Sequence, residues 1–131
     1  MDHKLKLMVV DDSPLFRTWL IHSLSADDRF QVVGYAVNAL DAQEKIPLLQ
    51  PDMLTLDIEM PGMSGIEFLK QLLPVHPIPV ILVSSLNLRV FDALEAGAVD
   101  FVRKPDEANG LSKEIFLSML RSKLMVAAAS H

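Results

Sequence analysis

The chain has 131 residues, of which 50% are hydrophobic and 22% are charged, and it contains no cysteine. This fits one globular domain and excludes a disulfide framework and a thiolate zinc site. The net charge of −5 disfavours a direct nucleic-acid partner, which would usually need a basic face. We see neither a secretory signal nor an apolar run long enough for membrane insertion, and therefore expect a soluble cytoplasmic protein.

Short apolar runs alternate with longer amphipathic runs along the whole chain. Strands are predicted at residues 5–10, 30–36, 52–56, 80–83 and 99–102. Helices are predicted at 14–24, 38–48, 64–73, 88–96 and 111–125, with Ser13 and Asn38 as caps and Gly97 as a stop. Strict alternation predicts an α/β fold, with a doubly wound, five-stranded parallel sheet covered on both faces. We expect one domain over 1–125, followed by a linker or chain end at 126–131.

Polar side chains gather where the predicted strands end. Asp11 and Asp12 follow the first strand, Asp57 follows the third, Ser84 follows the fourth and Lys104 follows the fifth. Because parallel strands bring their carboxyl ends to one edge of the sheet, these groups are expected to converge there. Individually, each has an ordinary explanation as a helix cap, a loop acid or a surface lysine. Their coincidence at four strand ends is what favours a site.

Three carboxylates in one pocket repel each other, and a hard divalent cation such as Mg²⁺ relieves that repulsion. A carboxylate can also attack phosphorus and form an acyl phosphate. Asp57 stands alone after a central strand and is the expected nucleophile, whereas Asp11 and Asp12 form a pair suited to metal. Lys104 and Ser84 are expected to neutralise charge on the transferring phosphoryl oxygens.

The strings DDS, LDIEMPGMSG, VSS and KP at these strand ends resemble the receiver domain of two-component response regulators. The resemblance covers nearly the whole chain and implies the CheY-like, flavodoxin-like fold. It implies that a partner histidine kinase phosphorylates Asp57. It also implies that Asp12, Asp57 and the backbone carbonyl of Glu59 ligate Mg²⁺ directly, with Asp11 acting mostly through metal-bound water.

The same resemblance assigns a switch to two residues near the site. Ser84 would bond the phosphoryl group, and Phe101 occupies the position of the aromatic ring that turns inward when Ser84 moves. Lys104 would pair with the phosphoryl group, and a cis peptide would precede Pro105. The face formed by the fourth helix, fifth strand and fifth helix would then carry the signal to a partner.

A finer resemblance is to the regulatory domain of chemotaxis protein-glutamate methylesterases, carried by DDSPLFR, DMLTLDIEMPGMSGIEFL, PVILVSSL and ALEAGAVDFVRKP. It implies a C-terminal methylesterase domain, or a chemoreceptor–kinase complex, as the partner. The chain contains no G-x-S-x-G motif, so enzymatic activity beyond its own phosphorylation is left open. One departure is a segment between Ser85 and Gly97 that is shorter than is usual in this family, which predicts that the fourth helix, or the loop before it, loses about one turn.

Other outputs and functions stay open at this point. The chain could be a stand-alone receiver or the receiver of a DNA-binding regulator. A haloacid-dehalogenase-type phosphatase also uses an aspartyl phosphate, but it carries its nucleophile on the first strand, where this chain has adjacent acids. A nucleotide-binding module is disfavoured because no glycine-rich loop follows the first strand.

Overall fold

The computed structural model describes residues 3–60, 62–85, 89–106, 108 and 110–130. Its single sheet is parallel and has the strand order β2-β1-β3-β4-β5. The strands are β1 Leu5–Val10, β2 Phe30–Ala36, β3 Met53–Leu56, β4 Val80–Ser84 and β5 Asp100–Arg103. The helices are α1 Pro14–Ser25, α2 Ala39–Leu49, α3 Gly65–Leu72, α4 Val90–Glu95 and α5 Lys113–Ala129. The predicted doubly wound five-stranded sheet is confirmed.

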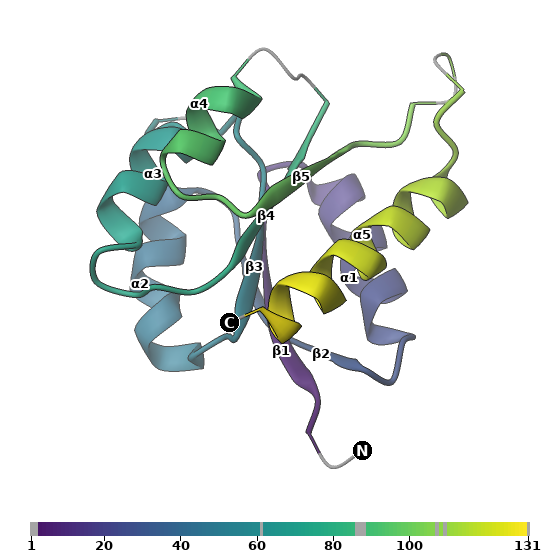
Figure 1. Ribbon diagram of the computed structural model, residues 1–131, viewed down its shortest axis with the longest axis horizontal. Helices are drawn as coiled ribbons and strands as arrows, with labels where there is room; N and C mark the ends of the chain where they lie inside the picture. Colours follow the sequence, from purple (N-terminus) through teal and green to yellow (C-terminus); the bar gives the residue numbers. More distant parts are fainter. Residues whose placement is uncertain (1–2, 61, 86–88, 107, 109, 131) are drawn as a thin grey trace.

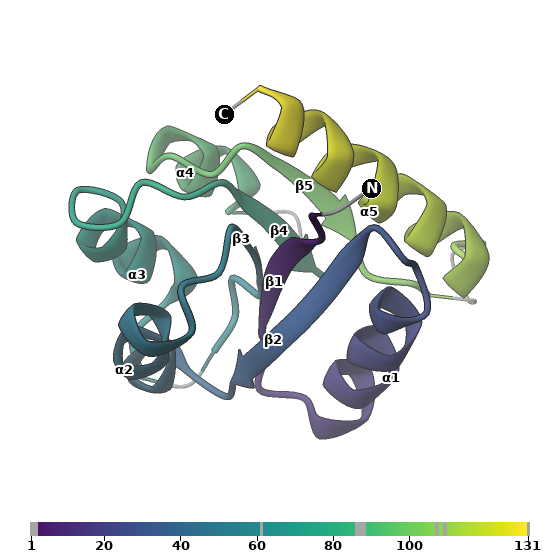
Figure 2. The same cartoon turned by 90° about the horizontal axis from the view of Figure 1, so that it is seen from below.

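The helices form two layers, one on each face of the sheet. Figures 1 and 2 show α1 and α5 on one face, and α2, α3 and α4 on the other. The strand order reverses between β1 and β3, since the chain moves outward from β1 to β2 and then returns past β1. In parallel α/β sheets, ligands bind outside the carboxyl ends of the strands at such a reversal. The fold therefore marks the ends of β1 and β3 as the expected site.

Each face of the sheet has its own apolar core. Phe30 and Phe116 are buried with α1 and α5 on one face, and Leu54 and Phe68 are buried beneath α2, α3 and α4 on the other. All residues of β3 and β4 are buried. Their near-continuous apolar sequence follows from this, because a strand covered on both faces has no solvent side.

The structure shifts several predicted boundaries. Compared with the prediction, β3 begins one residue later, β4 ends one residue later and β5 is shifted by one residue toward the C-terminus. Helix α4 begins at Val90, and Leu88, where it was predicted to begin, lies outside the described residues. The largest difference is in α5, which was predicted to end near Met125 but continues to Ala129. Leu124 and Ala127 are both buried and extend the packed stripe of α5, which explains the longer helix. The domain boundary at residue 125 stays a prediction.

The predicted helix signals at Asn38, Gly97 and Ser13 all lie at the expected ends of helices, but Ser13 does not cap through its side chain. The Asn38 side chain accepts a hydrogen bond from the Asp41 N–H and caps α2, and Gly97 has a φ of 116° just after α4. Ser13 precedes α1, but its side chain makes no capping hydrogen bond. Its N–H instead donates to Asp11 Oδ1 at 2.8 Å, so the local turn is built by the aspartate.

The prediction of a cis peptide before Pro105 is wrong, because the bond between Lys104 and Pro105 is trans. The trans isomer is favoured by about 0.5–1 kcal/mol even before proline. In the described part of the chain, no helix has the length and apolar character needed to cross a membrane.

Candidate functional site

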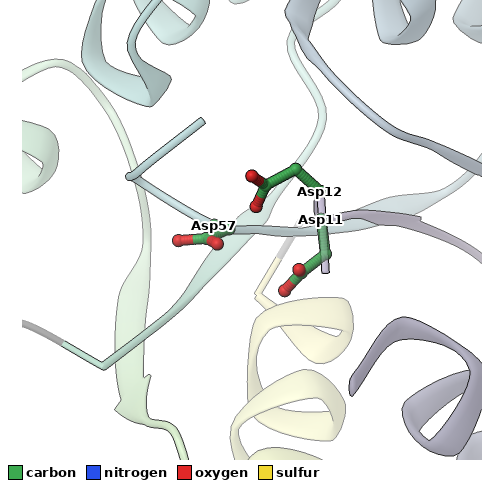
Figure 3. A group of neighbouring side chains, drawn as sticks. All are labelled: Asp11, Asp12 and Asp57. Carbon is green, nitrogen blue, oxygen red and sulfur yellow. The ribbon is translucent and has the colours of Figure 1, made fainter. Parts of the chain in front are cut away.

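The sheet itself positions the three acidic side chains. The Asp57 N–H donates to the carbonyl of Val10 at 3.0 Å, and the Asp11 N–H donates to the carbonyl of Ala36 at 3.0 Å. These bonds continue the parallel ladder just past the last residues of β1 and β3. The two aspartates therefore leave the sheet at the same edge, and Figure 3 shows the carboxylates of Asp11, Asp12 and Asp57 gathered there.

The three carboxylates lie close enough to share one cation. Each offers an oxygen, and these oxygens all lie within 4.8 Å of one another. Asp11 and Asp57 are only 2% and 6% exposed, whereas Asp12 is exposed. The cluster therefore has a buried floor and one side open to solvent, as an exchangeable ion or a small phosphodonor would require.

Lys104 reaches into this cluster from the end of β5. Its Nζ lies 3.0 Å from Asp11 Oδ2 and 3.2 Å from Asp57 Oδ2. The side chain of Lys104 is 15% exposed, so these ion pairs are largely shielded from water and weakly screened by salt. The backbone N–H of Lys104 also donates to the carbonyl of Ser84 at 2.9 Å, which fixes the strand end that carries the ammonium.

Backbone donors hold the remaining carboxylate oxygens. The Glu59 N–H donates to Asp57 Oδ1 at 3.0 Å, and the Ser13 N–H donates to Asp11 Oδ1 at 2.8 Å. Each buried aspartate is therefore oriented by one N–H group and by Lys104. Such oriented, partly desolvated charges are costly to rearrange and are suited to a fixed reaction geometry.

The electrostatic balance of the cluster is acidic. Burial raises the pKa of Asp57, and the nearby Lys104 ammonium and the Glu59 N–H offset this only in part. Burial alone would lower the pKa of Lys104, but the carboxylates of Asp57 and Asp11 outweigh it and hold that pKa above its usual value. Lys104 pairs with two of the three clustered carboxylates, so the pocket can accept further positive charge.

The donor set fits Mg²⁺. The three carboxylates supply hard oxygen ligands, which Mg²⁺ prefers, and the described cluster contains neither histidine nor thiolate. Mg²⁺ usually keeps several waters and binds through one or two carboxylates plus phosphate oxygens, and the open side at Asp12 leaves room for this. An acidic pocket able to bind Mg²⁺ is therefore present where the sequence predicted it.

The other predicted residues lie around this pocket. Ser84 is the last residue of β4 and is 3% exposed. Glu59 is exposed beside the site. Phe101 lies on β5, partly buried against the core beneath α4, and its carbonyl accepts a hydrogen bond from Lys123 Nζ of α5 at 2.7 Å. The structure thus joins Asp11, Asp12, Asp57 and Lys104 in one cluster. Phe101 lies on the edge strand β5, which leads to Lys104.

Sequence reasoning missed two residues of α1 that touch the site. Arg17 Nη1 donates to the carbonyl of Asp11 at 2.9 Å, and the ring of Phe16 lies 4.5 Å from Lys104 Nζ, measured to the ring centroid. Both lie in the first turns of α1, directly after Asp11-Asp12, so the sequence indicated that they lie near the strand ends but not which way their side chains point.

The match to known proteins places this architecture in a class. The profile of the response regulator receiver domain matches residues 7–116, which is most of the chain. The chain therefore belongs to the response regulator receiver domain family.

Within this family the chain is of the CheB type. The response regulator domain of Thermotoga maritima CheB is 37% identical, with a TM-score of 0.85 over 97% of this chain and 98% of that chain. A protein-glutamate methylesterase/protein-glutamine glutaminase 2 of Syntrophomonas wolfei is 46% identical over 98% of this chain. The protein of that description from Vibrio vulnificus is 44% identical over 100% of this chain.

The chain spans only 38% and 39% of the lengths of these two methylesterases. It corresponds to their receiver portion, and the comparisons favour a CheB-type receiver over the stand-alone, DNA-binding and phosphatase alternatives.

Proposed function

We propose that this domain accepts a phosphoryl group on Asp57 from a histidine kinase and thereby changes its contacts with a partner. The observation that carries the proposal is the buried Asp57 carboxylate, which lies in reach of two further carboxylates and 3.2 Å from the Lys104 ammonium. Receiver domains as a class take phosphoryl groups from histidine kinases, and we place this transfer in the cytoplasm.

Asp12, Asp57 and the backbone carbonyl of Glu59 are the proposed direct ligands of Mg²⁺, with Asp11 acting mostly through a metal-bound water. When bound, Mg²⁺ supplies positive charge that offsets the carboxylates and the phosphoryl oxygens. The acidic surplus of the cluster supports this assignment, since Lys104 pairs with only two of the three carboxylates among the described ion pairs.

The reaction is an in-line displacement at phosphorus. A carboxylate oxygen of Asp57 forms the new O–P bond while the P–N bond of the kinase phosphohistidine breaks. The electron pair of that bond stays on the imidazole nitrogen, which ends the reaction as neutral histidine. Lys104 balances charge on the phosphoryl oxygens, the Ser84 hydroxyl donates to one of them, and the Glu59 N–H keeps the Asp57 carboxylate oriented.

The phosphorylated state is proposed to be read out through Ser84 and Phe101. A phosphoryl group on Asp57 draws Ser84 toward it, and the space this frees lets the Phe101 ring turn inward. The added charge thereby shifts the equilibrium between two packed arrangements of Ser84 and Phe101. Since α4 has only six residues, the α4–β5–α5 face would be altered mainly through β5 and α5.

The partner at that face is proposed to be a C-terminal methylesterase domain in the full-length protein, or else a chemoreceptor–kinase complex. The length of the methylesterase relatives beyond the matched region supports this. The domain is then the phosphorylation-controlled part of a protein-glutamate methylesterase, and hydrolysis itself takes place outside it.

The proposal is tested by incubating the protein with acetyl phosphate and Mg²⁺ and measuring its intact mass. We expect the mass of one phosphoryl group to be added, and the addition to vanish with EDTA and in Asp57→Asn. The exposed Asp28→Asn variant is the control and should be phosphorylated like wild type. Undiminished phosphorylation of Asp57→Asn would refute the assignment.

A further inference from the structure

The Lys104 ammonium lies against an aromatic ring as well as between two carboxylates. Its Nζ is 4.5 Å from the centroid of the Phe16 ring and 3.0 Å and 3.2 Å from carboxylate oxygens of Asp11 and Asp57. A cation over the face of an aromatic ring is attracted by the ring quadrupole, most strongly where water is scarce. With 15% of its side chain exposed, Lys104 meets that condition.

The two carboxylates and the ring differ in what happens to them during the proposed reaction. Asp57 becomes an acyl phosphate, and Asp11 is proposed to contact a metal-bound water. Both ion-pair partners of Lys104 therefore make other bonds during the reaction. Phe16 binds neither metal nor phosphorus. It is therefore the contact of Lys104 that the reaction leaves unchanged.

Phe16 is itself held firmly. Its ring makes an edge contact with Phe116 of α5, with ring centroids 5.8 Å apart, and a tilted contact with Trp19 at 5.7 Å. Phe116 is 1% exposed and belongs to the core beneath α1 and α5. The Phe16 ring thus lines the site, and it is held by packing between two helices rather than by a loop.

We propose that Phe16 is a positioning residue for Lys104, keeping its ammonium aimed at the phosphoryl site when Asp11 and Asp57 have taken on metal and phosphorus. The inference deepens the proposed function and rests on it. An aromatic ring is suited to this role because, unlike a carboxylate, it attracts the ammonium without neutralising its charge. That full charge stays available to the phosphoryl oxygens.

The test compares three Phe16 variants and one control variant by two measurements. Phe16→Leu and Phe16→Met keep an apolar side chain but remove the π face, whereas Phe16→Tyr keeps the π face. Trp19→Leu is the matched control, since Trp19 touches Phe16 and Phe116 but the ring over which Lys104 lies is Phe16. The two measurements are the ring-current shift of the Lys104 side-chain protons by NMR and the affinity for beryllofluoride in the presence of Mg²⁺.

We expect the Lys104 protons to be shifted upfield in wild type, Phe16→Tyr and Trp19→Leu, and the shift to be lost in Phe16→Leu and Phe16→Met. Beryllofluoride affinity should fall about three- to thirtyfold in the Leu and Met variants, which corresponds to the usual strength of a cation–π contact. Phe16→Tyr should retain it. Thermal unfolding is measured to establish which of the Leu and Met variants is folded, and the affinity of a folded variant decides the test.

Unchanged beryllofluoride affinity in a folded Leu or Met variant would overturn the positioning role, while phosphorylation of wild type on Asp57 would still stand. An equal loss in Trp19→Leu would also overturn it, since general loosening of the aromatic cluster would then explain both. If wild type is not phosphorylated on Asp57, the proposed function fails, and this inference fails with it.

Discussion

At the scale of single residues, the fold disfavours the ionised form of the Asp57 side chain. Burial raises its pKa above the usual value of 3.8, so the folded protein holds the Asp57 proton more tightly than the unfolded chain does. Ionised Asp57 therefore costs stability. This cost is absent below pH 3.8 and grows as the pH rises through the folded-state pKa.

Asp57→Asn should consequently stabilise the metal-free protein at neutral pH. The expected result is a higher urea midpoint than wild type in EDTA, with the gain shrinking as the pH falls toward 3.8 and vanishing below it, where Asp57 is protonated in both states. Urea unfolding across this pH range measures it. A lower midpoint for Asp57→Asn at pH 7 would mean that Lys104 more than compensates the buried charge.

Glu59 is proposed to control how long the phosphoryl group stays on Asp57. Its exposed side chain lies beside the site, where a carboxylate can shield the acyl phosphate from water. Replacing it by the shorter, neutral side chain of Glu59→Asn should shorten the phosphoryl lifetime several-fold, as followed by ³¹P NMR after removal of the phosphodonor. The exposed Glu67→Asn serves as control, and equal lifetimes in all three proteins would exclude this role for Glu59.

At the scale of elements, the start of α3 is packed directly on the strand end that carries Asp57. A Cβ atom on Gly65 would lie 2.8 Å from Ile58 Cα and 3.1 Å from the carbonyl oxygen of Asp57. The Gly65 N–H also donates to the carbonyl of Ile58 at 3.0 Å. Only glycine permits this approach, because the neighbouring atoms are backbone and cannot rotate away.

Gly65→Ala should therefore disturb stability and the site together. We expect a loss of about 1–3 kcal/mol in unfolding free energy, typical of overpacking, and a slower reaction with acetyl phosphate. Lys70→Ala, an exposed change on the same helix, should affect neither. Loss of stability without any change in phosphorylation rate would show that α3 does not help to position Asp57.

A second inter-element contact joins the turn after α1 to α5. Asp27 Oδ2 lies 2.7 Å from Arg29 Nη2 and 3.5 Å from Arg121 Nε. Hydrogen bonding to Arg29, with a smaller effect of Arg121, lowers the pKa of Asp27 to about 2. A lowered folded-state pKa gives stability that is present above the unfolded value of 3.8 and lost as the pH falls toward about 2.

Asp27→Asn should accordingly be less stable than wild type at pH 7, and the difference between the two should narrow between pH 4 and pH 2. Asp28→Asn, its exposed neighbour, should unfold like wild type throughout. The measurement is the difference in urea midpoint as a function of pH. A constant difference would attribute the effect of Asp27→Asn to something other than its charge.

The elements also show what a single sequence can specify. Strand positions and the convergence of Asp11, Asp57 and Lys104 followed from alternation, because parallel topology leaves few ways to arrange five strands. The extent of α5 did not follow, since Ala127 becomes a packing residue only once the sheet lies against it. The contact of Phe16 with Lys104 joins residues far apart in the chain and depends on side-chain direction, which periodicity does not give.

At the scale of the whole molecule, the two edges of the sheet are expected to respond unequally to phosphorylation. The proposed signal passes from Ser84 to Phe101 and so reaches the α4–β5–α5 surface. Phe101 is linked there to α5 through the Lys123 hydrogen bond to its carbonyl. The edge formed by β2 and α2 lies on the other side of β1 and β3 from that surface.

Amide chemical shifts measured with and without beryllofluoride and Mg²⁺ should therefore change most around the site and along β5 and α5, and least along β2 and α2. Ser84→Ala should keep the changes near Asp57 but lose those at Phe101 and along α5. Changes of equal size on β2 would contradict transmission through Ser84 and Phe101.

The central claim is that Asp57, and neither Asp11 nor Asp12, carries the phosphoryl group. After reaction with acetyl phosphate and Mg²⁺, borohydride reduces an acyl phosphate to the alcohol, which converts the modified aspartate to homoserine. Peptide mass spectrometry then locates it. The account predicts homoserine at position 57 alone, and homoserine at position 11 or 12, with Asp57 intact, would contradict it.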